Sequence, residues 1–491
     1  MSSASPASSR AHYQVTFAVL ALGVAAYALL QSLVTPVLAT VGAELHASQS
    51  SVTWVMTAYL LSASIFTPIM GRLGDMIGKE KVFVATLGAL AVGSLLAALA
   101  GSLPLMIVAR VIQGVGGGVL PLSFGIIRDE FPREKVTGAV GIIASLTAVG
   151  AGLGIVLAGP IVSSLNWHWL FWIPMVLTAI AAVAALLFVP ESPVRSEGRI
   201  SWLPALLLSA WLVCFLVALS EAPDWGWGSF KVIGLLVLAV VLAALWVVAE
   251  QRSAAPLIDM AMMRQKAVWT NNLVALLVGV GMYATFAFLP EFVQSPAQAG
   301  YGFEASITHS GLMLLPNTVT MFVISILAGG LAARFGGKAL VVAGCAVASV
   351  GLFIIAFAHG QQWEIYVATG VLGIGIGAAF SAMSGLIVAA VPPEQTGVAS
   401  GMNANIRTIG GSIGSALMAS VVTSHVTASG FPKESGYTAG FAMLAVGMVI
   451  AAFAGLLIPA LRTRPSTSDH DAPHPEMGLV AAGTLVGDES E

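Results

Sequence analysis

The side chains best able to do chemistry in this sequence are charged residues inside or beside long apolar runs. Arg110 and Arg407 each interrupt such a run, and Asp75 and Lys79 lie in the short charged stretch GRLGDMIGKEKV at residues 71–82. A charged group within an apolar segment is costly unless it faces other protein groups or water. We therefore expect both arginines to face the interior of a helix bundle. Whether each takes part in function or only braces neighbouring helices is open at this stage.

The composition places these residues in a polytopic membrane protein. Of the 491 residues, 57% are hydrophobic and only 9% are charged, and the mean hydropathy is +0.93. No soluble domain of this length has such a composition. Cys214 and Cys345 both lie inside apolar runs, so we interpret them as packing residues and not as a disulfide or a metal pair.

Fourteen apolar stretches are long enough to cross a bilayer, which needs about 20 residues for each crossing. They are residues 15–41, 52–72, 82–101, 104–126, 137–162, 168–189, 201–220, 231–249, 268–292, 309–333, 339–358, 364–390, 397–423 and 437–461. With the N-terminus inside, only Lys231 and Lys433 of the 20 Lys and Arg residues fall in outside segments. Cytoplasmic loops carry an excess of these residues. We therefore expect both termini on the cytoplasmic side of the cell (plasma) membrane.

The charged stretch between the second and third spans resembles the signature loop of the major facilitator superfamily. Its pattern is Gly-x-Leu-x-Asp-x-x-Gly-Lys-x-Lys, and we expect a short hinge between two membrane helices. Glycines at Gly71 and Gly78 would let helix ends approach closely and turn. The resemblance implies that Gly71, Asp75, Gly78 and Lys79 form a latch between two halves of a transporter in its outward-facing state.

The sequence also contains internal echoes. GGLAARFGGK at residues 329–338 resembles residues 71–79, with Ala333 in the place of Asp75, and FPREKVTGA before the fifth span resembles VPPEQTGVA before the thirteenth. Two related six-span halves are the internal symmetry of this superfamily. The two spans within residues 201–250 have no repeat partner. Fourteen spans with an inserted pair resemble the drug–proton antiporter branch of the superfamily.

We therefore predict an all-α membrane protein of 14 transmembrane helices, with two pseudo-symmetric six-helix bundles plus two inserted helices. The predicted parts are a cytoplasmic N-terminal tail at 1–14, an N-terminal bundle at 15–200, two extra linker helices at 201–250, a C-terminal bundle at 251–461 and a disordered cytoplasmic tail at 462–491.

The sequence gives several candidate residues for proton coupling, and each has an alternative interpretation. Arg110 and Gln113 resemble the family's Arg followed by Gln-Gly, which implies a role in coupling; the alternative is a purely structural contact. Many members of the branch carry an acid in the middle of span 1, but here Leu30 stands at that position. Glu291 and His309 flank the loop between the ninth and tenth spans and could titrate with modest pKa shifts. Each could equally be a solvated interface residue.

A glycine-rich segment in the fifth span resembles the family's antiporter motif. It includes Gly150, Gly154, Gly159 and Pro160, but Ile155 stands where the family has proline. Small residues at this spacing permit close helix contact. Plain helix packing is therefore the alternative to a special role in antiport.

The residues expected to line the substrate cavity are spread over many spans. Amide, aromatic and charged side chains on spans that line the cavity in this family would supply it, since such groups make adaptable pockets for lipophilic ligands. They are Gln31, Tyr59, Asn271, Asn272, Tyr283, Asn317, Asn403 and Arg407. For any one of them ordinary packing is the alternative.

We conclude from the sequence that the protein is a secondary active transporter and not an enzyme. It would export lipophilic small molecules, such as a drug or a secondary metabolite, by alternating access in exchange for protons, and so confer antibiotic resistance. The expected partners are the lipid bilayer, the substrate and protons, with no nucleic acid, cofactor or metal, and the expected state is a monomer. Alternatives are an uncoupled facilitator or lipid carrier, which the missing acid in span 1 favours, and a membrane sensor that does not transport.

Overall fold

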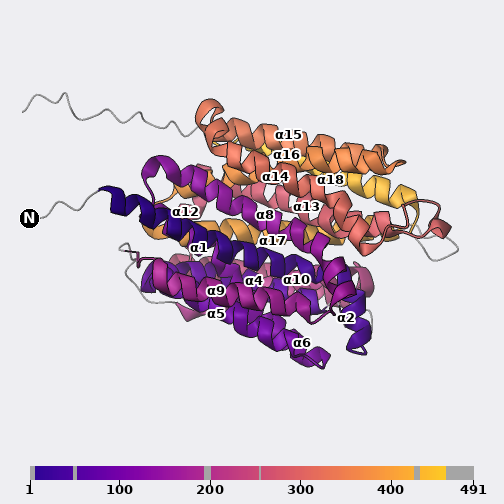
Figure 1. The fold of residues 1–491 in the computed structure, drawn as a ribbon, viewed down its shortest axis with the longest axis horizontal. Helices are drawn as coiled ribbons and strands as arrows, with labels where there is room; N and C mark the ends of the chain where they lie inside the picture. Colours follow the sequence, from indigo (N-terminus) through magenta and orange to yellow (C-terminus); the bar gives the residue numbers. More distant parts are fainter. Residues whose placement is uncertain are drawn as a thin grey trace, which may run out of the picture. The chain divides into compact units, whose positions relative to one another are not determined.

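The computed structural model describes residues 6–47, 52, 54–192, 201–253, 256–424 and 432–459. Their regular elements are α-helices and short 3-10 helices, and Figure 1 shows most of the long helices running side by side. The α-helices are α1 (Pro6–Leu33), α2 (Leu38–Glu44), α4 (Trp54–Ile77), α5 (Lys79–Ala98), α6 (Leu103–Gly114), α7 (Val119–Glu130), α8 (Arg133–Ser164), α9 (Trp169–Phe188), α10 (Trp202–Trp225), α11 (Phe230–Arg252), α12 (Met260–Arg264), α13 (Lys266–Gln294), α14 (Ile307–Phe335), α15 (Gly337–Phe357), α16 (Gln362–Ala390), α17 (Thr396–Thr423) and α18 (Glu434–Gly455). The 3-10 helices are η1 (Thr35–Val37), η2 (Val115–Gly118), η3 (Ala297–Ala299) and η4 (Pro393–Gln395).

The fourteen predicted spans all fall on helical segments. Thirteen segments of the described chain are long and apolar enough to cross a membrane, and α8 covers the remaining predicted span at 137–162. Two predicted spans are interrupted. The first breaks after Leu33, where Pro36 follows in η1, because proline lacks an N–H for the helix ladder. The fourth breaks at the glycine run of η2, because glycine is a weak helix former.

The charged stretch at 71–82 is less of a loop than we expected. Helix α4 continues to Ile77 and α5 begins at Lys79, so Asp75 lies on a helix and only Gly78 turns the chain. Gly78 has φ +129°, and Gly336, its counterpart in the sequence echo, has φ +89° between α14 and α15. Side chains disfavour these angles, so glycine is required at both turns.

The structure describes part of the predicted N-terminal tail and none of the predicted C-terminal tail. Helix α1 already begins at Pro6, so the predicted N-terminal tail at 1–14 is partly helical. Its helical residues extend the first span by more than two turns at 3.6 residues per turn. The predicted tail at 462–491 lies outside the described residues.

Helix contacts link segments that are distant in the sequence. Helix α8 packs against α1 on one side and against α14 and α16 on another, while α4 packs against α17. Helix α10, one of the two helices without a repeat partner in the sequence, packs against α11 and also contacts both α4 and α17. One helix of the pair without a repeat partner, α10, is therefore in contact with helices from both halves of the sequence.

Candidate functional site

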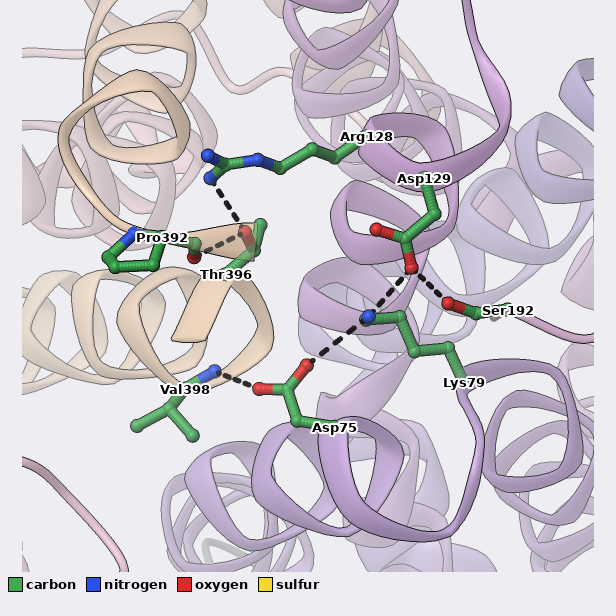
Figure 2. Close-up of polar contacts among 8 residues, drawn as sticks. All are labelled: Asp75, Lys79, Arg128, Asp129, Ser192, Pro392, Thr396 and Val398. Carbon is green, nitrogen blue, oxygen red and sulfur yellow. Dashed lines mark hydrogen bonds and ion pairs between the residues drawn. The ribbon is translucent and has the colours of Figure 1, made fainter. Parts of the chain in front are cut away.

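Asp75 joins α4 to the start of α17. Its Oδ2 accepts a hydrogen bond from the backbone N–H of Val398 at 3.3 Å, across 323 residues of sequence (Figure 2). Val398 lies in the first turn of α17, where unpaired N–H groups and the helix dipole favour a negative charge. Asp75 is fully buried. Its carboxylate therefore caps a helix that belongs to the other end of the chain.

Lys79 balances the buried carboxylates at this place. Its Nζ lies 2.7 Å from Asp129 Oδ2 and 3.7 Å from Asp75 Oδ1, and its side chain is 1% exposed. Ser192 also donates a hydrogen bond to Asp129 (Figure 2). A buried charge needs such partners to offset its lost hydration.

Arg128 adds a second bridge between the same two regions. Its Nη1 donates to Thr396 Oγ1 at 2.7 Å, at the first residue of α17, and to the carbonyl of Val388 in α16. From here on, the latch is the set of residues Gly71, Asp75, Lys79, Arg128, Asp129 and 396–398. Arg128 and Thr396 were not predicted as site residues. The available signal was that Arg128 lies just before the first of the two echoed Pro-containing segments and Thr396 lies within the second.

The latch also rests on a close backbone approach. A Cβ placed on Gly71 would lie 2.6 Å from the carbonyl oxygen of Gly397, and a Cβ on Gly397 would lie 2.8 Å from the carbonyl oxygen of Gly71. Neither backbone atom can rotate away. Helices α4 and α17 therefore meet at a distance that only glycine permits.

A cavity of about 400 Å³ lies between the helices that the latch joins. Seven helices contribute to its wall: α1, α4, α8, α10, α13, α16 and α17. We call it the central cavity. Its lining is mainly apolar with scattered hydroxyl groups, and it comprises Gln31, Ser32, Met56, Thr57, Leu60, Leu61, Thr147, Ile155, Leu216, Leu219, Ser220, Met282, Tyr283, Phe286, Ala287, Phe288, Phe380, Arg407, Thr408, Gly411, Ser412, Ser415, Ala416 and Ala419.

Arg407 is the charged residue of this lining. Its Cζ lies 4.3 Å from the centroid of the Phe380 ring, close enough for a cation–π contact. Tyr283, also on the wall, lies near enough to interact with it electrostatically. The Nε atom of Arg407 is buried and has no hydrogen-bond partner in the described chain.

Arg110 lies behind the wall and not on it. Its Nη1 donates to Gln113 Oε1 at 2.9 Å, and Gln113 Nε2 donates to Ser94 Oγ at 3.1 Å. The guanidinium stands over the rings of Tyr59 and Phe171, with Cζ 5.2 and 5.6 Å from their centroids. The structure thus brings together three residues that the sequence assigned to two sites: Tyr59 to the cavity, and Arg110 and Gln113 to coupling.

A second cavity, of about 420 Å³, adjoins the first and shares Ile155, Phe286 and Ala287 with it. Glu291 lies on its wall and accepts a hydrogen bond from the Tyr437 hydroxyl at 3.0 Å. We call it the far cavity, because Glu291 is in the last turn of α13. Asp259, shortly before the start of α13, accepts a hydrogen bond from Gln395 beside the latch. His309 is not part of this wall; it is in the first turn of α14, where its N–H is capped by Ser306.

Comparisons with known proteins decide the family. A model of the Major Facilitator Superfamily matches residues 20–415 and also 273–486. The chain belongs to the Major Facilitator Superfamily. It is therefore a multi-pass membrane transporter and not an enzyme, as the sequence predicted.

Similar proteins include resistance and transport proteins. The Multidrug resistance protein B homolog of Mycobacterium tuberculosis is 31% identical over 397 residues, which are 78% of this chain and 71% of that protein. The Tetracenomycin C resistance and export protein of Streptomyces glaucescens is 28% identical over 420 residues, 84% of this chain and 76% of that protein. The solved structure of the human organic anion transporter MFSD10 has a TM-score of 0.66 at 16% identity, and the match covers 90% of this chain and 99% of that one. That last likeness concerns the fold alone.

The antiporter-like glycines of this transporter are helix contacts in the structure. A Cβ on Gly150 would lie 2.6 Å from Cβ of Ala28 in α1, and one on Gly154 would clash with Ser32 Oγ. A Cβ on Gly159 would clash instead with Thr308 in α14. The glycines therefore let α8 fit tightly between α1 and α14. Pro160, the last residue of the predicted motif, is exposed on the same helix.

Of the eight residues predicted for the substrate cavity, Gln31, Tyr283 and Arg407 line the central cavity. The four asparagines lie elsewhere. Asn403 Nδ2 donates to Asn272 Oδ1 at 2.8 Å, and Asn271 Nδ2 donates to the carbonyl of Met383 at 2.9 Å, so these side chains link helices. Asn317 is 1% exposed and lines neither of the two cavities.

The contribution of α10 to the wall of the central cavity was not predicted from the sequence. Leu216, Leu219 and Ser220 line the wall, and Ser220 Oγ lies 3.1 Å from Thr57 Oγ1 of α4. An inserted helix is thus part of the cavity of this transporter. Ser220 stands at the end of an apolar run, directly before Glu221, so it gave little signal in the sequence.

Proposed function

We propose that this transporter exports lipophilic small molecules, a drug or a secondary metabolite, by alternating access in exchange for protons. The observation that carries the proposal is the mainly apolar central cavity, which adjoins the far cavity at one side while the latch joins α4 and α17 at the other. Apolar walls with few polar groups suit lipophilic ligands. A single central site that opens first to one side and then to the other is the mode of such transporters.

The direction of opening follows from the charges. If the Lys- and Arg-rich segments are cytoplasmic, the latch closes the cytoplasmic side and the far cavity leads outward. This arrangement would be an outward-facing state held by Asp75 at the start of α17. Both termini would then be cytoplasmic. The Tetracenomycin C resistance and export protein among the similar proteins supports the outward direction.

Glu291 is the best-placed candidate for proton coupling. It lies on the wall of the far cavity, where it would meet protons from outside, and Tyr437 donates a hydrogen bond to it. Protonation would remove its charge and weaken its hold on Tyr437, since hydrogen bonds to charged groups are the stronger ones. Arg110 would act from behind the central cavity, through Met56, which lines the wall and lies 3.5 Å from its Nη2.

An uncoupled facilitator is the second candidate. The residues that line the central cavity include no Asp or Glu, and Leu30, at the position of the usual acid, is fully buried. A carrier without a titratable acid in its binding site has no obvious means to exchange substrate for protons there.

Inverted membrane vesicles that contain the protein distinguish the two candidates. A proton gradient is established and followed with a pH-sensitive dye while lipophilic anions, neutral compounds and cations are added in turn. Partial collapse of the gradient with some compounds supports proton-coupled export. Movement of a labelled compound without collapse supports the facilitator. Vesicles without the protein are the control for passive leak.

A further inference from the structure

Some buried charged residues of the described chain form ion pairs and others do not. The charged residues with buried side chains include Asp75, Lys79, Asp129, Arg110, Glu250 and Arg407. Asp75 and Lys79 are paired within the latch. Glu250 accepts hydrogen bonds from the N–H groups of Leu257 and Ile258 and from Trp246. In the described residues neither arginine forms an ion pair with a carboxylate.

The two arginines differ in their surroundings. Arg110 is enclosed by protein, with Gln113, Met56 and two aromatic rings around it. Arg407 lines the central cavity, whereas Arg110 does not. In both arginines the Nε atom has no hydrogen-bond partner in the described chain, so access from the cavity is what distinguishes them. A guanidinium carries five donors in a planar fork. The ring of Phe380 covers one face of that fork but accepts no conventional hydrogen bond.

The remaining wall offers no negative charge to this cation. Its polar members are an amide, the phenol of Tyr283 and the hydroxyl groups of serine and threonine residues. A lipophilic cation in the central cavity would therefore meet a like charge with little water to screen it. The phenol of Tyr283 is a polar neighbour of Arg407 but carries no full negative charge. A lipophilic anion would supply a charged partner, and a carboxylate or sulfonate matches the guanidinium fork.

We propose that the central cavity binds lipophilic anions, with the ligand's acidic group paired to Arg407 and its apolar body against the walls of α10 and α13. This inference rests on the proposed function, because it names the class of the exported compound. It assigns Arg407, and not Arg110, to ligand binding. The acidic group is a carboxylate, a sulfonate or an ionised phenol.

The test uses three fluorescent probes that share one apolar body. They are 1-pyrenebutyrate, its methyl ester and (4-pyren-1-ylbutyl)trimethylammonium. Binding to the purified full-length protein in phosphatidylcholine nanodiscs is measured by titration. We expect the wild type to bind the anion about 10- to 100-fold more tightly than the ester or the cation, which is the range for a hydrogen-bonded charge.

Variants assign the preference to one residue. Arg407→Gln should lose about 10- to 100-fold in affinity for the anion and leave the ester within a few-fold. Arg407→Lys should retain part of the preference, because a point charge remains. Gln31→Glu adds an acid to the wall and should shift preference toward the cation without changing Arg407. Arg334→Gln, at an exposed site near the end of α14, is the matched control.

The outcomes separate this inference from the proposed function. If no probe binds the wild type, both the lipophilic site and the inference fail. If the ester or cation binds as tightly as the anion, or if Arg407→Gln keeps the preference, the inference is overturned while a lipophilic site stands. If Arg407→Gln does not fold, Arg407→Lys and Gln31→Glu still decide, since unchanged selectivity in both overturns the inference.

An anionic lipid headgroup offers the same chemistry as a soluble anion. The titration of 1-pyrenebutyrate is therefore repeated in nanodiscs that contain phosphatidylglycerol. Displacement of the probe identifies the lipid as a ligand at the Arg407 site. Binding that is unchanged by phosphatidylglycerol supports a free lipophilic anion as the ligand of that site.

Discussion

One added methyl group at Gly71 should open the latch. In the latched conformation a Cβ at this position lies 2.6 Å from the carbonyl oxygen of Gly397 and 2.8 Å from its carbonyl carbon. Both are backbone atoms, so α4 and α17 must separate by several tenths of an ångström. Overpacking of this kind costs roughly 1–3 kcal/mol. Since the strain exists only while the helices touch, the latched population should fall about 5- to 150-fold relative to the open one.

Spin labels at the latch end measure this shift. Lys81 and Glu394 are exposed, on α5 and in η4, and each is replaced by cysteine after Cys214 and Cys345 have been removed. Pulsed dipolar spectroscopy then gives the distribution of distances between the two labels. We expect one dominant short distance in the parent protein and a large added population at longer distance in Gly71→Ala.

The matched control is Gly88→Ala in α5, where a Cβ would have no heavy atom within 4 Å. It should leave the distribution unchanged. A Gly71→Ala protein that is folded, as judged by its elution and melting profile, and that keeps the parent distribution would refute the account of the latch.

Three further changes test separate parts of the site. Asp75→Asn removes the charge that caps α17, worth roughly 0.3–1 kcal/mol at a helix N-terminus and up to about 2 when buried, and should slow turnover while substrate affinity stays within a few-fold; turnover equal to wild type would count against a role in gating. Leu216→Trp should fill part of the central cavity and weaken binding of bulky ligands, whereas Leu206→Trp, at a position on the same helix that is 65% exposed, should not; equal affinities in the two variants would remove α10 from the binding site. Glu291→Gln cannot ionise, so the dependence of transport on external pH should flatten; a curve that matches wild type would exclude Glu291 as the proton carrier.

Local features of this transporter were predictable from sequence because their causes are local. The turns at Gly78 and Gly336 follow from glycine at an echoed position between two apolar runs. Fourteen apolar stretches of sufficient length predicted the helices, since a spanning chain must satisfy its backbone hydrogen bonds within each segment. The interruption of the fourth span could have been anticipated from its run of glycines.

The partners of the charged residues were not predictable in the same way. Asp75 accepts a hydrogen bond from the backbone of Val398, and no side-chain pattern in the sequence marks a backbone donor 323 residues away. Arg407 and Arg110 look alike in sequence, but one lines the cavity and the other lies behind it. Which face of a helix meets the cavity depends on its rotation and its neighbours, and the amides at Asn271 and Asn403 lie on faces that contact other helices.

The central claim is that lipophilic molecules cross the membrane through the central cavity. The most direct measurement is flux of labelled lipophilic anions, neutral compounds and cations in proteoliposomes with an imposed pH gradient. It compares the wild type with Ser412→Trp, a change on the cavity wall, and with Leu206→Trp as the control for an added indole. The account predicts that at least one compound accumulates with the wild type and with Leu206→Trp but not with a folded Ser412→Trp protein. It is contradicted if no compound moves faster than in empty liposomes, or if Ser412→Trp transports at the wild-type rate.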